Sequence, residues 1–181
     1  MYQGSSPQGR PPPPRTIVAM PNARRIAVGS DSRHPIPDAI AGWLEAGGFA
    51  VIRCGAVDAA DTSWPEAAEQ VARLVAQGAV EAGVVCCWTG TGVSIAANKV
   101  PGIRAALCKD AETAGGARRW NGANVLALAL SDATADAAQA IVESFLGTTG
   151  IDPAEEANVQ RVAAMERRYS GSGGEEGSRR R

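Results

Sequence analysis

The sequence predicts an α/β fold, because short apolar runs alternate along it with longer segments of helical periodicity. Five of these runs are rich in β-branched or small apolar residues and have the length of strands. They are IAVGS at 26–30, AVIRC at 50–54, AGVVCC at 82–87, IRAAL at 103–107 and NVLALAL at 124–130. Regular alternation of strand and helix implies parallel strands joined by right-handed crossovers. We therefore expect a Rossmann-like three-layer α/β/α sandwich with a five-stranded parallel sheet.

The segments between the strands carry apolar residues at helical spacing. Val71 and Val75, for example, follow Ala68 at the third and seventh positions. This periodicity predicts helices near 36–47, 65–77, 92–99, 110–120 and 132–146. Pro37 and Pro65 suit the first turns of two of these helices.

The two ends of the chain differ in composition from its middle. Residues 1–23 hold a run of four prolines among Gly, Ser and Gln, and residues 170–181 are mostly Gly, Ser and charged residues. Such segments bury too little apolar area to offset chain entropy. We expect a disordered leader and a disordered tail around an α/β domain at 24–150. Met20 is an alternative to Met1 as the translation start.

A further helix is predicted at 151–169, beyond the last strand-associated helix. Val159, Val162 and Met165 form an apolar stripe along it. The stripe fits packing on the domain and fits contact with a partner subunit, and the sequence leaves both interpretations open.

Composition excludes several classes of function. The 18 basic and 19 acidic residues nearly cancel, so no global positive field exists to hold nucleic acid or an anionic membrane. No stretch approaches the roughly 18 apolar residues of a membrane span, and the N-terminus lacks the apolar region of a secretory signal. We expect a cytoplasmic protein with no nucleic-acid and no membrane partner.

The sequence also argues against a metal site. The cysteines Cys54, Cys86, Cys87 and Cys108 show no C-x-x-C spacing, and His34 is the single histidine. These are too few nitrogen ligands and the wrong thiol spacing for a usual zinc centre. We expect no metal.

The most informative segment follows the third predicted strand and reads CCWTGTGVSIAANK at 86–99. A strand ends there in a thiol, and a Gly-rich turn opens into a helix whose free N–H groups favour an anion or a thiolate. Gly90 and Gly92 lack the third glycine of a dinucleotide motif, because position 95 is Ile95, and no Gly-Lys-Ser/Thr triplet follows. We therefore expect no nucleotide cofactor.

The cysteine pair in this segment has two interpretations. Free cysteine is often a core residue, so a buried pair that closes an apolar strand is one of them. In the other, one thiol is activated for chemistry. The period of two places Cys86 and Cys87 on opposite faces of the sheet, so Cys87, which is nearer the turn, is the candidate.

Polar residues follow the first predicted strand. Asp31 either binds substrate hydroxyls or caps the following helix, and His34 is either a surface turn residue or a ligand contact. Ahead of the fifth strand, Asn121 and Asn124 either orient a polar ligand or satisfy a turn. Trp120 is a large aromatic residue that we expect where this loop approaches the carboxyl edge of the sheet.

Three segments together resemble one enzyme family. They are VGSD at 28–31, the block from Cys87 to Ala105, and the Asn-x-x-Asn-Val-Leu segment at 121–126. These segments resemble the type B ribose-5-phosphate isomerases and the related galactose-6-phosphate isomerases over about residues 24–168. The resemblance implies a cofactor-free isomerase that acts on a small molecule, a sugar phosphate or related carbonyl compound, and forms a homodimer or homotetramer.

The resemblance also implies roles for individual residues. Cys87 is the catalytic base that moves a proton between C1 and C2, and Thr89 is the second catalytic residue. The backbone N–H groups from Thr89 to Gly92 hold the enediolate. The residues expected to bind the substrate are Asp31, Ser32, Trp88, Gly90, Thr91, Gly92, Trp120, Asn121 and Arg161.

The sequence departs from the family pattern at several positions. Ser32 replaces a usual histidine, Trp120 replaces the histidine that helps to open the sugar ring, and Gly122 replaces a usual aspartate. The family's Asp-Tyr-Pro is Ser-Trp-Pro at 63–65, and Arg161 alone remains of the C-terminal phosphate-binding cluster. These changes predict reduced ring opening and phosphate capture, and hence an open-chain sugar phosphate or an unphosphorylated, more apolar substrate.

Three functions fit the sequence. The first is an aldose–ketose isomerase whose substrate differs from ribose 5-phosphate. The second is another enolisation, epimerisation or tautomerisation, of a non-phosphorylated substrate in a pocket shaped by Trp64, Trp88 and Trp120. The third is a non-catalytic isomerase-like subunit.

Overall fold

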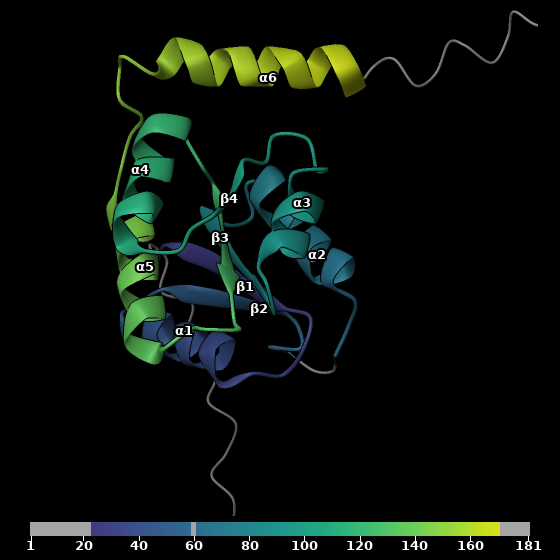
Figure 1. Cartoon of the computed structure of the whole chain (residues 1–181), viewed down its shortest axis with the longest axis vertical. Helices are drawn as coiled ribbons and strands as arrows, with labels where there is room; N and C mark the ends of the chain where they lie inside the picture. The colour runs from purple at the N-terminus through teal and green to yellow at the C-terminus, as the bar shows by residue number, and fades with distance from the viewer. Residues whose placement is uncertain (1–22, 59–60, 171–181) are drawn as a thin grey trace, which may run out of the picture.

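The computed structural model describes residues 23–58 and 61–170 of the chain (Figure 1). The predicted leader, up to residue 22, and the tail, from residue 171, lie outside the described residues. Within the described part, five strands form one sheet whose neighbouring strands are all parallel. The strands are β1 (Arg25–Ser30), β2 (Ala50–Gly55), β3 (Ala82–Cys87), β4 (Ala105–Leu107) and β5 (Val125–Ala129). Their order across the sheet is β2-β1-β3-β5-β4.

A helix follows each strand, and one more ends the described chain. The helices are α1 (Pro35–Ala46), α2 (Trp64–Ala76), α3 (Thr91–Ala97), α4 (Ala111–Asn121), α5 (Ala135–Gly147) and α6 (Glu156–Ser170). Helices α1, α4 and α5 cover one face of the sheet, and α2 and α3 cover the other (Figure 1). The predicted α/β fold with a five-stranded parallel sheet is confirmed.

The fourth strand is shorter than the sequence predicts. Ile103 and Arg104 read as strand residues, yet the N–H of Ile103 bonds to the Val100 carbonyl in a turn, 3.1 Å. The N–H of Arg104 donates to the side-chain oxygen of Asn124, 2.8 Å. A side-chain amide thus takes the place of a ladder bond, and the strand begins at Ala105.

Two glycines let α2 pack directly on the middle of the sheet. A Cβ atom on Gly29 would lie 2.7 Å from Cγ2 of Val71, and one on Gly83 would overlap the other methyl group of Val71. Both glycines face α2, from β1 and β3. Val71 therefore fills the space that their missing side chains leave, and the buried valine stabilises the contact.

The helix starts are fixed by local side-chain caps. Ser63 and Glu66 form a reciprocal capping box at the start of α2. Hydrogen bonds from Thr62 and Ser63 lower the pKa of the Glu66 carboxyl group. At α1 the cap is His34, whose Nδ1 accepts from the N–H of Ile36 at 3.2 Å. His34 is thus a helix cap in this structure.

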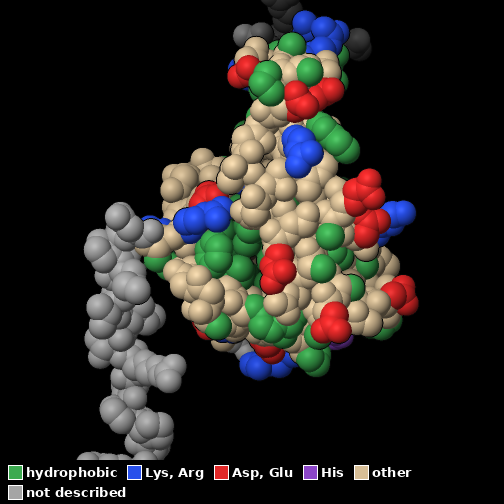
Figure 2. All heavy atoms as spheres, turned by 90° about the vertical axis from the view of Figure 1, so that its left-hand side faces the viewer, with side chains coloured by type: hydrophobic (Ala, Val, Ile, Leu, Met, Phe, Trp, Pro, Cys, Tyr) green, Lys and Arg blue, Asp and Glu red, His purple; other side chains and the backbone are tan. Residues whose placement is uncertain are grey.

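The last helix, α6, lies across the end of the sheet from which the strands start (Figure 1). None of its residues is buried. In the space-filling view it projects beyond the rest of the protein (Figure 2). A hydrogen bond from the N–H of Gly102 to the Glu166 carboxylate, 2.9 Å, links α6 to the loop before β4. No helix of the described residues is long and apolar enough to cross a membrane.

Candidate active site

The carboxyl ends of β1 and β3 bring the first two candidate segments together. Ser30 and Cys86 are paired in register on these neighbouring strands. Asp31 and Cys87, the next residues in the chain, therefore emerge at the same edge of the sheet. Ligands of open parallel sheets collect at this carboxyl edge.

The turn that follows Cys87 requires a glycine at position 90. The N–H of Gly90 donates to the Cys87 carbonyl at 3.2 Å, and Gly90 has a φ of 69°. A Cβ atom there would lie 2.5 Å from Cδ1 of Leu107 and 2.8 Å from the backbone nitrogen of Ala129. Both the backbone conformation and the space exclude a side chain.

The segment after β5 anchors the same turn from the other side. The N–H of Leu130 donates to the carbonyls of Cys87 and Trp88, both at 3.1 Å, and the N–H of Ser131 donates to the Trp88 carbonyl at 3.0 Å. The backbone of Trp88 is therefore fixed, while its side chain is 65% exposed. Trp88 thus follows the candidate base directly in the chain, with its indole largely in solvent.

The start of α3 presents free donors next to this turn. The helix has no side-chain cap, and its first intrahelical bond runs from the N–H of Ser94 to the Gly90 carbonyl, 3.2 Å. The N–H groups of Thr91, Gly92 and Val93 are thus open to an anion, whereas that of Gly90 is already bonded to Cys87. The hydroxyl oxygens of Thr89 and Thr91 are 2.7 Å apart and hydrogen-bonded, so both lie at the mouth of the turn.

The other thiols of the chain are poor candidates for a base. Burial and, second, the Asp58 carboxylate raise the pKa of Cys54 to about 11. Burial, with Asp110, raises the pKa of Cys108 to about 11, and burial raises that of Cys86 further. These thiols stay protonated at neutral pH. Cys87 is 5% exposed and is the thiol that adjoins the turn.

Asp31 is not the helix cap that one interpretation of the sequence expects, because His34 caps α1. The Asp31 carbonyl accepts from the N–H of Thr62 at 2.9 Å. Its carboxylate accepts from the hydroxyl of Ser32 at 3.2 Å. Asp31 and Ser32 thus form a polar pair at the carboxyl edge, available for substrate hydroxyls.

Trp64 also belongs to this edge, although the sequence analysis considers it only as part of an alternative pocket. A Cβ atom on Gly92 would lie 3.1 Å from Cδ2 and Cε3 of the Trp64 ring, so the ring covers Gly92. Trp64 is 45% exposed. The signal in the sequence is the position of Trp64 in the first turn of the helix that follows the second strand, because that turn starts at the carboxyl edge.

Asn121 lies at the opposite edge, in the last turn of α4, which runs back from the end of β4 to the start of β5. Cys87 pairs with Ala129, four residues beyond Val125 on β5, which is about 13 Å at roughly 3.3 Å per residue. Trp120 belongs to the same last turn, but its ring lies over Gly116 and lines a pocket with Leu107 and Cys108 at the carboxyl end of β4. The side chain of Trp120 thus points back toward the carboxyl edge, at the outer strand of the sheet.

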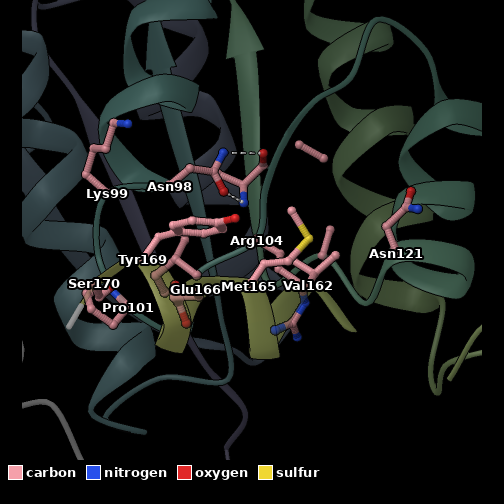
Figure 3. Close-up of a pocket in the computed structure, with 14 residues that line it drawn as sticks. Asn98, Lys99, Pro101, Arg104, Asn121, Val162, Met165, Glu166, Tyr169 and Ser170 are labelled. Atoms are coloured by element: carbon pink, nitrogen blue, oxygen red, sulfur yellow. Dashed lines mark hydrogen bonds between the residues drawn. The ribbon is translucent and has the colours of Figure 1, made fainter. Parts of the chain in front are cut away.

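Arg161 also lies away from Cys87, on α6 at the amino edge. Between α6 and this edge runs an open groove of about 690 Å³ (Figure 3). It is lined by polar and apolar side chains that include Lys99, Arg104, Asn121, Met165 and Tyr169. The residues expected to bind the substrate thus fall into two groups, one at each edge of the sheet.

Two asparagines of the family-like segments have structural roles. The Asn98 side chain accepts from the N–H of Ala105 and donates to its carbonyl, both at 2.8 Å, which covers the open edge of β4 (Figure 3). The Asn124 side chain joins Arg104 to Gly102. Of the two interpretations of Asn124, the structure favours the turn residue.

The large apolar side chains that remain exposed in the described part gather in two patches. The carboxyl-edge patch surrounds α3 and consists of Trp64, Trp88, Ile95 and Leu107. The amino-edge patch lies on α6 and the segment before it and consists of Ile151, Val162, Met165 and Tyr169. The exposed Trp120 lines a separate pocket with Leu107. No group of three or more His, Cys, Asp or Glu side chains in the described ranges is arranged to hold a metal ion.

Comparison with known proteins agrees with the geometry. The sequence profile of the ribose/galactose isomerase family matches residues 26–165. Ribose-5-phosphate isomerase B of Escherichia coli is 36% identical over 146 residues, which are 80% of this chain and 98% of the relative. D-Erythrulose-4-phosphate isomerase of Pectobacterium atrosepticum is 33% identical over 123 residues, which are 67% of this chain and 81% of the relative.

Solved structures of ribose-5-phosphate isomerases have the same fold as this chain. The ribose-5-phosphate isomerase B of Clostridium thermocellum superimposes with a TM-score of 0.75 at 35% identity, over 80% of this chain and 99% of that one. The enzyme of Trypanosoma brucei gives a TM-score of 0.73 at 35% identity, over 80% and 100% of the two chains. The chain is therefore an isomerase and belongs to the ribose/galactose isomerase family of sugar-phosphate isomerases.

Proposed function

We propose that this protein interconverts an aldose and a ketose through an enediolate, with Cys87 as the base. The observation that carries the proposal is the position of Cys87 at the end of β3, directly before a Gly90 turn and the uncapped first turn of α3. A thiol beside free helix N–H groups combines a base with an oxyanion site.

The reaction needs two proton transfers. In the aldose-to-ketose direction, the Cys87 thiolate takes the proton from C2, and the electron pair moves through C1 onto O1. The resulting enediolate oxygen is held by the N–H groups at the start of α3. The thiol then returns the proton to C1, while a proton passes from O2 to O1 through the Thr89 hydroxyl. Positioned acid–base groups of this kind contribute about 10²–10⁴-fold to rate.

The remaining carboxyl-edge residues bind the substrate in this proposal. The Asp31 carboxylate accepts hydrogen bonds from sugar hydroxyls. The hydroxyl groups of Ser32 and of Thr91, in the turn, both donate hydrogen bonds to sugar hydroxyls and accept them. Trp88 and Trp64 offer aromatic faces to the apolar C–H groups of the sugar. No group in this scheme requires a cofactor.

We further propose that the site is shared between two copies of the chain. Asn121 and Arg161 lie at the amino edge, so in this proposal they belong to the Cys87 site of a second copy. In a two-fold dimer, a contact of one surface with a different surface of the partner occurs twice, once from each copy. The carboxyl-edge patch of each copy is then covered by the amino-edge patch of the other. The exposure of α6 and of both apolar patches supports this arrangement.

The test is hydrogen exchange in D2O, followed by NMR at C1 and C2 of aldoses and ketoses, with and without phosphate. The Cys87→Ala variant should lose at least about 10³-fold in exchange rate. Cys108→Ala removes another buried thiol outside the turn and should stay within about threefold of the wild type. Equal exchange by the wild type and Cys87→Ala, with both folded, would contradict the assignment of the base.

A further inference from the structure

The indole ring of Trp64 lies directly on the backbone of the Gly-rich turn. A Cβ atom on Gly92 would be 3.1 Å from Cδ2 and Cε3 of the ring and 3.6 Å from Cε2. Gly92 is the second residue of α3 and does not have a positive φ, so its backbone conformation accepts any residue. The ring therefore explains the glycine at this position, because a side chain on it would push the indole off the turn.

The backbone that carries Trp64 is fixed from two sides. The Glu66 carboxylate accepts from the hydroxyls of Thr62 and Ser63, both at 2.8 Å, within the capping box of α2. The N–H of Thr62 also donates to the Asp31 carbonyl at 2.9 Å, which ties the start of α2 to the loop after β1. The indole is thus held over the turn by its own helix start, while 45% of Trp64 remains exposed.

The ring and the candidate base lie on the same face of the sheet. Cys87, Ala68 and Val93 belong to one buried cluster between the sheet and the helices α2 and α3. Ala68 follows Trp64 by one helical turn, and Val93 follows Gly92 directly. A ligand that contacts Cys87 at this end of β3 is therefore next to the indole as well.

We infer that Trp64 is a positioning residue for the enediolate, because its indole covers the turn and keeps water from the N–H groups that hold the enediolate oxygen. The inference rests on the proposed isomerisation and assigns a further role to one of its side chains. An apolar ring excludes water without competing for these N–H groups, and hydrogen bonds to an anion are stronger where water is excluded. The cover therefore favours the enediolate over the uncharged substrate. Stacking of the ring on sugar C–H groups would instead stabilise both alike.

Two inhibitors of equal chain length separate these two roles. D-Erythronohydroxamate 4-phosphate carries a planar hydroxamate that resembles the enediolate. D-Erythritol 4-phosphate has the same carbon chain and the same phosphate without the hydroxamate. The corresponding five-carbon pair extends the comparison to a longer chain. Calorimetric titration gives the Kd of each compound, and the ratio of the two Kd values measures the preference for the enediolate-like group.

The expected effect of the cover is on this preference alone. The wild type should bind the hydroxamate at least about a hundredfold more tightly than the alditol phosphate. Trp64→Ala should reduce the preference at least about tenfold and change the Kd of the alditol phosphate by less than about threefold. Trp64→Phe keeps a ring and should lose no more than about threefold. Ile95→Ala removes another exposed side chain of the carboxyl-edge patch and should leave the preference unchanged.

A second variant tests the contact from the side of the turn. Gly92→Ala leaves the indole in the chain but displaces it, and it should reduce the preference by about threefold or more. In the Trp64→Ala background, the same change should have no further effect, because no ring remains to be displaced. An equal effect of Gly92→Ala in both backgrounds overturns the inference, because the added methyl group would then act on the ligand itself.

The outcomes separate the inference from the proposed function. Equal losses of affinity for both compounds in Trp64→Ala, or no loss for either, overturn the inference and leave the isomerase proposal intact. Equal losses of preference in Trp64→Ala and Ile95→Ala also overturn it, because the patch as a whole would then set the preference. A wild type without any preference for the hydroxamate contradicts the oxyanion site, and hence both the proposed function and the inference.

Discussion

The two edges of the sheet are built from the same alternation of strand and helix but are held together differently. At the carboxyl edge, backbone groups hold the Cys87 turn, with Leu130 and Ser131 as donors. At the amino edge, the side chains of Asn98 and Asn124 hold the loop before β4. A turn fixed through its backbone leaves its side chains and N–H groups for a ligand. Side chains that hold a loop are no longer available for one.

The edges also differ in charge and in what they leave exposed. The described loops that precede the strands carry Arg24, Lys99 and Arg104 against Glu81, whereas the loops that follow the strands are acidic. Each edge exposes an apolar patch, and the carboxyl edge adds the Cys87 thiol and the uncapped donors at the start of α3. The comparison supports the two proposals that the reaction takes place at the carboxyl edge and that the amino edge contacts a second copy.

The largest expected effect comes from a glycine at each edge. Gly90→Ala should destabilise the protein by about 3 kcal/mol and abolish exchange, because it adds a Cβ atom at positive φ against Leu107 and Ala129. Gly102→Ala also changes a glycine at positive φ, 83°, but into open space, and should cost only about 1 kcal/mol with activity retained. Urea unfolding measures the free energy of unfolding of both variants. Similar losses of stability in the two variants would contradict this difference between the edges.

The next effect concerns the asparagines of the amino edge. Asn98→Ala removes both hydrogen bonds to Ala105 and should destabilise the protein by about 2 kcal/mol. We expect kcat to stay within about threefold of the wild type at a temperature where the variant is folded. A loss of kcat of more than a hundredfold, with the free energy of unfolding unchanged, would instead show that Asn98 takes part in the reaction.

Mixing variants of the two edges tests whether the site is shared. Cys87→Ala and Arg161→Ala are each expected to be impaired alone. After joint unfolding and refolding, an equal mixture should recover about a quarter of wild-type activity, because half of the dimers are mixed and each mixed dimer has one complete site. Recovery is absent if both residues act within one protomer.

The smallest effect is a pH dependence at the amino edge. The hydrogen bond from Arg24 lowers the pKa of the Glu81 carboxyl group in the folded protein. A lowered pKa means that this pair stabilises the fold above the unfolded pKa of Glu, near 4.5, and that the contribution is lost as the pH falls through the folded value. Because the pair is well exposed, Glu81→Gln should cost less than about 1 kcal/mol at pH 7, and the difference should shrink as the pH falls below 4.5. Unfolding curves at a series of pH values measure the difference, and a difference that does not shrink as the pH falls would exclude the ion pair as its origin.

The sequence alone predicts the layers of the fold, and it places a thiol directly before a Gly-rich turn. The periodicity of apolar residues, and the Gly and Pro residues at the ends of helices and strands, are local features of the chain. The five strands and the helices between them therefore follow from the order of residues. Cys87 is recognisable because a strand, a Gly-rich turn and a helix start follow one another directly in the chain. The start of β4 is not recognisable, because the side chain of Asn124, twenty residues away, replaces a ladder bond at Arg104.

What the sequence determined is therefore the fold class, the thiol before the turn and the family to which the segments are similar. The tertiary structure decided which candidate residues meet. Asp31, Trp64 and Cys87 come together because neighbouring parallel strands end at one edge. Asn121 lies at the other edge because α4 returns antiparallel to its strand, and Arg161 lies there because α6 crosses the amino end of the sheet. That separation depends on strand order and helix direction in space, which no local pattern of residues records.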